Sequence, residues 1–221
     1  MLTGRGCEGG DVRSKRWRRT RSLVLLSLLL ITAMVVWVQV FRGVPTIDQS
    51  VGCTPPTPGV SAVGFHDLDG VAPAPPDRVP VRMFNASSQR GAAGLMSLEL
   101  ADLGFPQAAE AADDPAHPLG NMSCVGQIRF GAQGAAGART LSLLVPCAQL
   151  VRDNRPDATV DFAVGTNFNG LIVNTAARKV LGQLSTWGRQ HPIPPGGLLT
   201  QDQAMPKLDT PLLTAARPGH C

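Results

Sequence analysis

Cysteine is the side chain in this sequence that can form covalent cross-links, and four of the five cysteines follow a long apolar segment. Cys53, Cys124, Cys147 and Cys221 are an even number, which permits three pairings into two disulfides. We favour Cys124–Cys147, because both fall inside the predicted folded core. Closing that loop of about 24 residues would stabilise the fold by roughly 3 kcal/mol. Cys53 and Cys221 would then form the second pair. The Cys and His spacing does not match a zinc site, so we expect no bound metal.

A second candidate site begins at Asn85. Asn85-Ala-Ser87-Ser precedes a predicted helix, and Asn and Ser side chains commonly cap helix N-termini. The same turn could bind a phosphate or carboxylate through free backbone N–H groups, with Arg90 nearby. We favour the structural role for Asn85, Ser87 and Arg90, because every helix start offers such N–H groups.

The remaining charged residues form no recognisable catalytic set. His66, Asp67 and Asp69 interrupt a proline-rich segment, where a solvated turn is favoured over a metal or catalytic cluster. The other candidates belong to different predicted elements. Glu99 and Asp102 lie on a predicted helix surface, and His117 lies in an acidic loop. No Ser/His/Asp arrangement can be argued from them. We therefore expect no catalytic residues and no cofactor.

The elements that would position these residues form a compact unit over residues 79–168. Alternating apolar residues predict strands, and apolar residues at helical spacing predict helices. In chain order the predicted elements are a strand at 79–84, a helix at 91–104, a weaker strand at 105–112, a strand at 124–130, a helix at 134–145, and strands at 147–153 and 159–165. This order predicts a small α+β fold with one mixed sheet and helices packed on one face.

Residues 22–41 are predicted to cross a membrane. They form a run of 20 residues without a charge, which as a helix would be about 30 Å long, the thickness of one hydrocarbon core. Basic residues cluster before this run, so the tail of residues 1–21 is expected in the cytoplasm and the rest outside the cell. The run ends in large side chains instead of a small-residue cleavage site, which favours a retained anchor over a signal peptide.

The segments on either side of the compact unit are predicted to be simpler. Residues 42–78 are rich in proline and should form an extended extracytoplasmic stalk. Residues 169–188 carry apolar side chains at helical spacing and predict an amphipathic helix, which is expected to pack on the domain more readily than to bind a partner. Residues 189–221 are predicted to be an extended tail.

The distribution of charge argues against nucleic acid as a partner. The pI of 9.1 reflects the N-terminal end, because residues 1–42 contain 8 of the 20 basic residues and only 2 of the 16 acidic ones. The rest of the chain therefore has a net charge of −2, without the excess of positive charge that a nucleic-acid-binding face needs. The sequence has no tyrosine and only 3 tryptophans, so a broad aromatic platform for sugars or bases is not expected.

The start of the compact unit resembles a known family. The sequence VPVRMFNASSQRGAAGL at residues 79–95, followed by Leu103-Gly104-Phe105, is similar to the opening of the LytR C-terminal domain, and the likeness runs to about Phe168. The resemblance implies a small α+β domain of actinobacterial envelope proteins. It also implies a role in keeping the cell envelope intact, with a contribution to virulence or survival in a host.

Three functions agree with this reading to different degrees. The favoured one is a non-enzymatic protein, tethered to the cell membrane, whose domain binds a cell-wall polymer or envelope proteins. The alternative is an enzyme, or an accessory to one, that assembles the cell wall or modifies glycopolymers; the short stalk leaves no room for the catalytic domain that often accompanies this family. A third is a regulatory partner that uses its anchor as the contact. The sequence identifies neither the ligand nor the oligomeric state.

Overall fold

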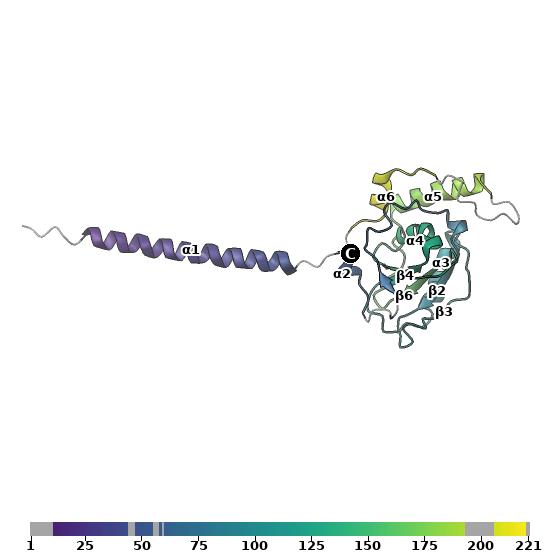
Figure 1. The fold of residues 1–221 in the computed structure, drawn as a ribbon, viewed down its shortest axis with the longest axis horizontal. Coiled ribbons are helices and arrows are strands. Elements are labelled where there is room, and N and C mark those ends of the chain that lie inside the picture. Colours follow the sequence, from purple (N-terminus) through teal and green to yellow (C-terminus); the bar gives the residue numbers. More distant parts are fainter. Residues whose placement is uncertain (1–10, 44–46, 55–57, 59, 193–205, 220–221) are drawn as a thin grey trace, which may run out of the picture. The chain divides into compact units, whose positions relative to one another are not determined.

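The computed structural model of the chain describes residues 11–43, 47–54, 58, 60–192 and 206–219 (Figure 1). The chain divides into two compact units, Met1–Pro45 and Thr46–Cys221. The first contains α1 (Asp11–Gly43), a helix of 33 residues that includes the predicted span, and its apolar side chains between Leu23 and Val38 are exposed. Within the described residues, no helix combines the length and apolar character needed to cross a bilayer.

The second unit is built on one mixed sheet, as the order of predicted elements indicated, but it has six strands where five were predicted, because the segment predicted to be a stalk supplies one. The strands are β1 (Ser61–Ala62), β2 (Val81–Asn85), β3 (Ala112–Asp113), β4 (Gly126–Phe130), β5 (Gln149–Arg152) and β6 (Val160–Val164), and their spatial order is β1-β5-β4-β6-β2-β3. β1 runs antiparallel to β5 and β4 antiparallel to β6, whereas the other neighbours are parallel.

The helices of this unit connect the strands and cover them. They are α2 (Ile47–Val51), α3 (Ala92–Asp102), α4 (Ala135–Ser142), α5 (Thr175–Gln190) and α6 (Thr210–Ala216), with short 3-10 turns at Pro76–Arg78 and Ala132–Gly134. α3 links β2 to its parallel neighbour β3, and α4 links β4 to its parallel neighbour β5. The domain therefore contains two consecutive strand–helix–strand units, which confirms the repeated plan seen in the sequence.

The hydrophobic core lies between the sheet and the pair α3 and α4 (Figure 1). Successive side chains of a strand point to opposite faces, so the apolar residues at every second position meet these helices. They come from four strands and both helices, and include Met83, Ile128, Phe130, Leu150, Phe162, Met96, Leu100 and Leu141. α4 can pack closely because a Cβ at Gly137 would lie only 2.8 Å from Val79 Cγ1.

The first strand–helix–strand unit differs from expectation at its third element. The strand predicted at 105–112 is reduced to β3, two residues long, and an isolated bridge between Val81 and Gln107. α3 itself ends at Asp102, two residues before Gly104, which takes the left-handed φ of 88° that favours glycine after a helix. The alternating pattern was correct for β2 but weak for its edge partner, because an edge strand buries little apolar surface.

The predicted proline-rich stalk is wrong for the residues that the structure describes between 47 and 78. Phe65 and Leu68 are buried, and Ser61 and Ala62 of β1 pair with β5. The Ala74 carbonyl accepts a hydrogen bond of 2.7 Å from Thr140 Oγ1 on α4. Proline prevents regular structure but does not prevent burial, so the apolar side chains between the prolines fix this segment to the domain.

The extended tail predicted for residues 189–221 is also corrected. α5 continues to Gln190, and α6 packs on it, with Ala216 buried in one cluster with Ala177, Val180, Leu184 and Leu143. The same cluster confirms that the amphipathic helix packs on the domain. Pro211 does not prevent α6, because proline is tolerated in the first turn of a helix, where its missing N–H has no intrahelical partner. Residues 193–205 lie outside the described part.

Both predicted disulfide pairings are wrong. Cys53 is bonded to Cys124, with their Cα atoms 4.8 Å apart. Cys124 lies on the sheet face opposite α3 and α4, in a small cluster with Ala86, Met122 and Ala163, and the N-terminal segment brings Cys53 there. Cys147 is disulfide-bonded as well, to a cysteine outside the described residues. The prediction paired Cys124 with Cys147 because both fall inside the folded core, but it did not foresee that the N-terminal segment brings Cys53 to Cys124.

We predict that a proteolytic digest under non-reducing conditions will yield a peptide pair joined through Cys53 and Cys124, and a second pair joined through Cys147 and Cys221. Cys221 is the remaining cysteine of the second compact unit. Replacing Cys53 and Cys124 together by serine should lower the free energy of unfolding by about 4 kcal/mol, because the bond closes a loop of 71 residues. A peptide that joins Cys124 to Cys147 would contradict the structure.

Candidate functional site

Charged and amide side chains line the face of the sheet opposite α3 and α4. Arg82, Arg129 and Asp161 alternate with the core residues of their strands and so point away from the core. The register places Arg129 of β4 directly opposite Asp161 of β6, and Asp161 opposite Arg82 of β2. One row across three strands therefore reads Arg, Asp, Arg. In the next row Gln127 of β4 is paired with Gln149 of β5.

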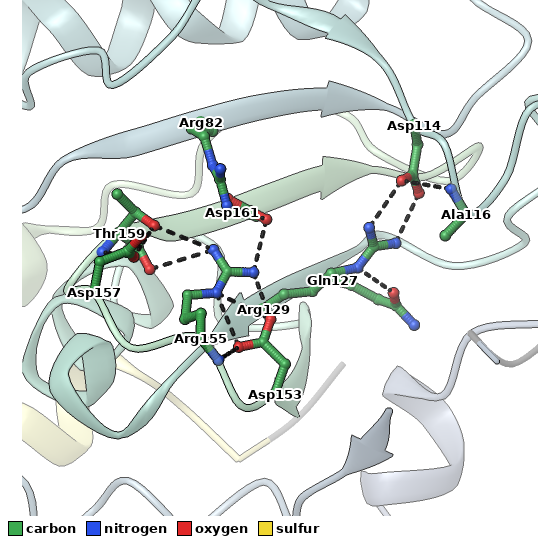
Figure 2. Close-up of polar contacts among 10 residues, drawn as sticks. All are labelled: Arg82, Asp114, Ala116, Gln127, Arg129, Asp153, Arg155, Asp157, Thr159 and Asp161. Atoms are coloured by element: carbon green, nitrogen blue, oxygen red, sulfur yellow. Dashed lines mark hydrogen bonds and ion pairs between the residues drawn. The ribbon is translucent and has the colours of Figure 1, made fainter. Parts of the chain in front are cut away.

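Asp161 is the centre of one cluster on this face (Figure 2). Its Oδ1 accepts a hydrogen bond of 2.6 Å from Arg82 Nε, and its Oδ2 accepts one of 2.7 Å from Arg155 Nη2. Arg155 also donates to Asp153, at 2.9 Å from Nε and 2.5 Å from Nη2. Burial alone would lower the pKa of Arg155, but its hydrogen bonds to Asp153 and Asp161 raise it above the usual value.

Asp114 is the centre of the second cluster, at the other end of the row (Figure 2). Arg129 binds it in a bidentate manner, with Nη1 at 2.8 Å from Oδ1 and Nη2 at 2.7 Å from Oδ2. His117 Nδ1 lies 2.9 Å from the same Oδ2. The side chains of Asp114 and His117 are 0% and 1% exposed, so this carboxylate has exchanged water for an arginine and a histidine.

The electrostatics of Asp114 follow from these partners. Burial by itself would raise the pKa of Asp114, because a carboxylate loses its hydration. The hydrogen bonds and positive charge of Arg129, with His117 and the Ala116 N–H, more than offset this and hold the pKa below its usual value. Asp114 therefore stays ionised at neutral pH. Arg129 is held in turn by Gln127 Oε1, 2.9 Å from its Nε.

The ion pairs of this face hold backbone segments in place. Asp114 and His117 belong to the loop between β3 and β4, and Arg155 to the loop between β5 and β6, so the ion pairs hold both loops on the sheet. A general base must reach a substrate proton, but both oxygens of Asp114 are engaged and His117 is buried. The accessible part of the face is around Arg82, whose side chain is 35% exposed.

The structure places the predicted ligand-binding residues in a local turn. Asn85 Oδ1 accepts from Ser87 N at 3.2 Å and from Ser87 Oγ at 2.8 Å, and Asn85 Nδ2 donates to the Gln89 carbonyl. The prediction that Asn85 and Ser87 cap the following helix is wrong: the N-cap of α3 is Gly91, and it has no side-chain cap. The short side chains of Asn85 and Ser87 form their hydrogen bonds within residues 85–89 instead of with the helix. Arg90 is exposed on the same turn.

The other residues considered from the sequence do not come together. Glu99 and Asp102 are exposed on α3, as predicted, whereas His117 is buried in the Asp114 cluster. His66 and Asp67 lie in an exposed turn, and His66 Nδ1 is 2.7 Å from Asp69 Oδ2. Within the part of the chain that the structure describes, no group of three or more His, Cys, Asp or Glu side chains is placed to hold a metal ion.

Sequence reasoning missed both charged clusters. A signal for them was present, because Arg82, Arg129 and Asp161 all occupy the polar positions of predicted strands. Their pairing depends on β4 and β2 both lying beside β6, and neither neighbour follows from the order of strands along the chain. Asp114 could not be assigned a partner for the same reason.

Comparison with known proteins agrees with this architecture. Residues 78–168 match the LytR_C family, described as LytR cell envelope-related transcriptional attenuator. The chain is 36% identical over 185 residues to the cell envelope integrity protein Cei of Mycobacterium tuberculosis, an alignment that covers 79% of this chain and 85% of that protein. The chain belongs to the Cei family.

A solved structure supports the same relation. The crystal structure of the soluble domain of a conserved hypothetical secreted protein from Mycobacterium marinum is similar, with a TM-score of 0.60 and 32% identity, over 73% of this chain and 97% of that chain. Because both alignments are much longer than residues 78–168, the likeness to the Cei family includes segments outside the LytR_C domain. Those segments pack on the sheet and on α4 in this structure.

The buried ion pair gives a test of the charged face. Asp114→Asn leaves Arg129 buried without a carboxylate, which should lower the free energy of unfolding at pH 7 by about 3 kcal/mol. Since the pKa of Asp114 is lowered by folding, its contribution is present above the unfolded pKa and is lost as the pH falls through the folded value. The wild-type chain should therefore lose more stability than the variant as the pH falls through and below the ordinary carboxyl value of 3.8.

Urea denaturation at a series of pH values measures both effects. Asp102→Asn, which removes an exposed carboxylate from α3, is the matched control and should change stability little. Equal losses for the two variants at pH 7 would mean that Asp114 does not hold the loop on the sheet.

Proposed function

We propose that this chain is a membrane-anchored, non-catalytic protein that helps to maintain the integrity of the cell envelope. The observation that carries the proposal is the 36% identity to Cei over 79% of the chain, because it covers far more than the shared LytR_C domain. A protein of this kind would act by binding a cell-wall polymer or another envelope protein. A weakened envelope would in turn reduce survival in a host.

The position of the domain outside the cell rests on two features. Disulfides persist in oxidising compartments and are rare in the cytosol, and Cys53 is bonded to Cys124. The similar solved domain comes from a protein described as secreted. The anchor itself is supported by the uncharged run of residues 22–41, by the exposed apolar side chains of α1 from Leu23 to Val38, and by the basic residues that precede the run.

A binding role is favoured over a catalytic one because the polar side chains of the charged face are paired with each other or buried. The carboxylates on the charged face are engaged by arginines, and the histidine beside Asp114 is buried. By contrast α3 presents Leu95 and Leu98 to solvent, 68% and 62% exposed, one turn apart on its outer surface. Exposed apolar side chains that lie together are typical of surfaces that bind another macromolecule.

The proposal can be tested in the bacterium that encodes the chain. Replacing the gene by one that encodes only residues 1–45 should increase uptake of a membrane-impermeant DNA dye and sensitivity to lysis, because the anchor would remain without the domain. Full-length chain carrying Arg178→Gln, a change at an exposed position of α5, should behave as wild type. Unchanged permeability in the truncated strain would contradict a role in envelope integrity.

Two further measurements separate the parts of the proposal. Alkaline phosphatase fused to the C-terminus should be active, because it folds with its disulfides only outside the cytoplasm. A version of residues 46–221 released by a cleavable signal peptide should restore dye exclusion poorly if tethering matters. Turnover of a cell-wall precursor by the purified chain would contradict the non-catalytic assignment.

A further inference from the structure

Two arginines are buried next to each other where the two ends of the compact unit meet α4. Arg139 lies on α4 and is 2% exposed, and Arg217 follows α6 and is 4% exposed. The guanidinium of Arg217 stacks on the ring of Phe65, 3.7 Å from its centroid, and one Nη1 donates to the Phe65 carbonyl. Arg217 is thus held by the segment between β1 and β2.

Most of the hydrogen-bond donors of this pair are unused. Nε and Nη1 of Arg139, and Nε and Nη2 of Arg217, are buried and have no hydrogen-bond partner among the described residues. Arg139 Nη1 does lie 2.9 Å from Asp69 Oδ1, so this carboxylate is its partner and three nitrogens are left without an acceptor. Buried donors are normally satisfied, so these three, on two neighbouring side chains, call for an acceptor.

The two carboxylates near the arginines, Asp69 and Asp48, are also engaged by other groups. Asp69 is the carboxylate in contact with Arg139, and it is shared with His66, 2.7 Å from its other oxygen. Asp48 is close enough to influence Arg217, but its Oδ1 already accepts the Phe65 N–H at 2.7 Å. Burial, and then repulsion from Arg139, lower the pKa of Arg217 to about 10. The pair of cations is therefore only partly compensated.

A groove of about 350 Å³ lies beside the pair, and its lining includes Asp69, Lys207 and Leu213 but neither arginine. Asp69 lines the groove and contacts the Arg139 guanidinium, so this carboxylate stands between the groove and Arg139. Asp69 is 45% exposed and Lys207 is exposed, so Lys207 places a third cation at the entrance of the groove.

We infer that Arg139 and Arg217 form a binding site for a phosphate group, which enters by the groove beside Lys207. A phosphate is favoured over a carboxylate because the unused donors belong to two guanidinium planes, and an acceptor with three or four oxygens can meet both planes at once. Three cations also match its greater negative charge. In the absence of phosphate, the Asp69 carboxylate occupies the position nearest to Arg139, and on binding it turns to the exposed His66.

The test is phosphate binding by the full chain in a non-ionic detergent. Inorganic phosphate should raise the melting temperature more than chloride at equal ionic strength, since a ligand that binds only the folded state stabilises it. Titration calorimetry should show binding weakened by about tenfold or more in Arg139→Gln, because charge-assisted hydrogen bonds are lost. Arg178→Gln makes the same change of charge at an exposed position and should bind as wild type.

A second variant keeps the test valid if loss of an arginine prevents folding. Asp69→Asn removes the anion that competes with phosphate, so binding should become several-fold tighter. If the arginines only fasten the C-terminal segment to the domain, the same variant would lose stability and gain no affinity. A phosphate-independent melting temperature in both the wild-type chain and Asp69→Asn would overturn the inference.

Two probes distinguish the source of the phosphate. Dihexanoyl phosphatidylglycerol, a phosphodiester, should compete with inorganic phosphate if the site takes a lipid headgroup or another diester. Lack of competition, with inorganic phosphate still bound, would restrict the site to free phosphate or a monoester. Glutamate should not compete in either case, and tighter binding of glutamate than of phosphate would overturn the assignment of the ligand.

Discussion

The bidentate pair of Arg129 and Asp114 is the interaction on which the second face of the sheet depends. β4 is central in the sheet and is buried along its whole length, although it carries an arginine. A guanidinium cannot be buried there unless an anion accompanies it. The loop after β3 supplies that anion, with His117 beside it, and so must cover the strand. This loop continues to Cys124, whose bond to Cys53 fixes the N-terminal segment on the same side.

The two faces of the sheet are consequently stabilised by different physics. One face is closed by apolar packing against α3 and α4, which is insensitive to pH and weakly directional. The other face is closed by directional ion pairs and hydrogen bonds. Asp161 accepts from Arg82 and Arg155, and Asp114 accepts from Arg129. A broken ion pair leaves a buried charge, whereas a trimmed apolar side chain leaves only a cavity, so the charged face tolerates less change.

The segments before and after the LytR_C domain belong to the same folded unit and meet at Arg139 and Arg217. Phe65 and Asp69 come from the segment between β1 and β2, and Arg217 follows the last described helix. The segment between β1 and β2 and the segment after α6 thus contact each other, and the first of them also contacts α4. This agrees with the similarity to Cei, which extends well beyond the family domain.

The sequence alone determined the elements whose signal is local. Alternation fixed β2, β4, β5 and β6 to within about two residues, helical periodicity identified α3, α4 and α5, and the run of residues 22–41 identified the proposed anchor. The tertiary structure alone decided which distant residues meet: Cys53 with Cys124, Arg129 with Asp114, Arg217 with Phe65. Each of these contacts depends on strand order and on which face a segment covers. Such choices are made by burial over the whole chain, so no window of the sequence contains them.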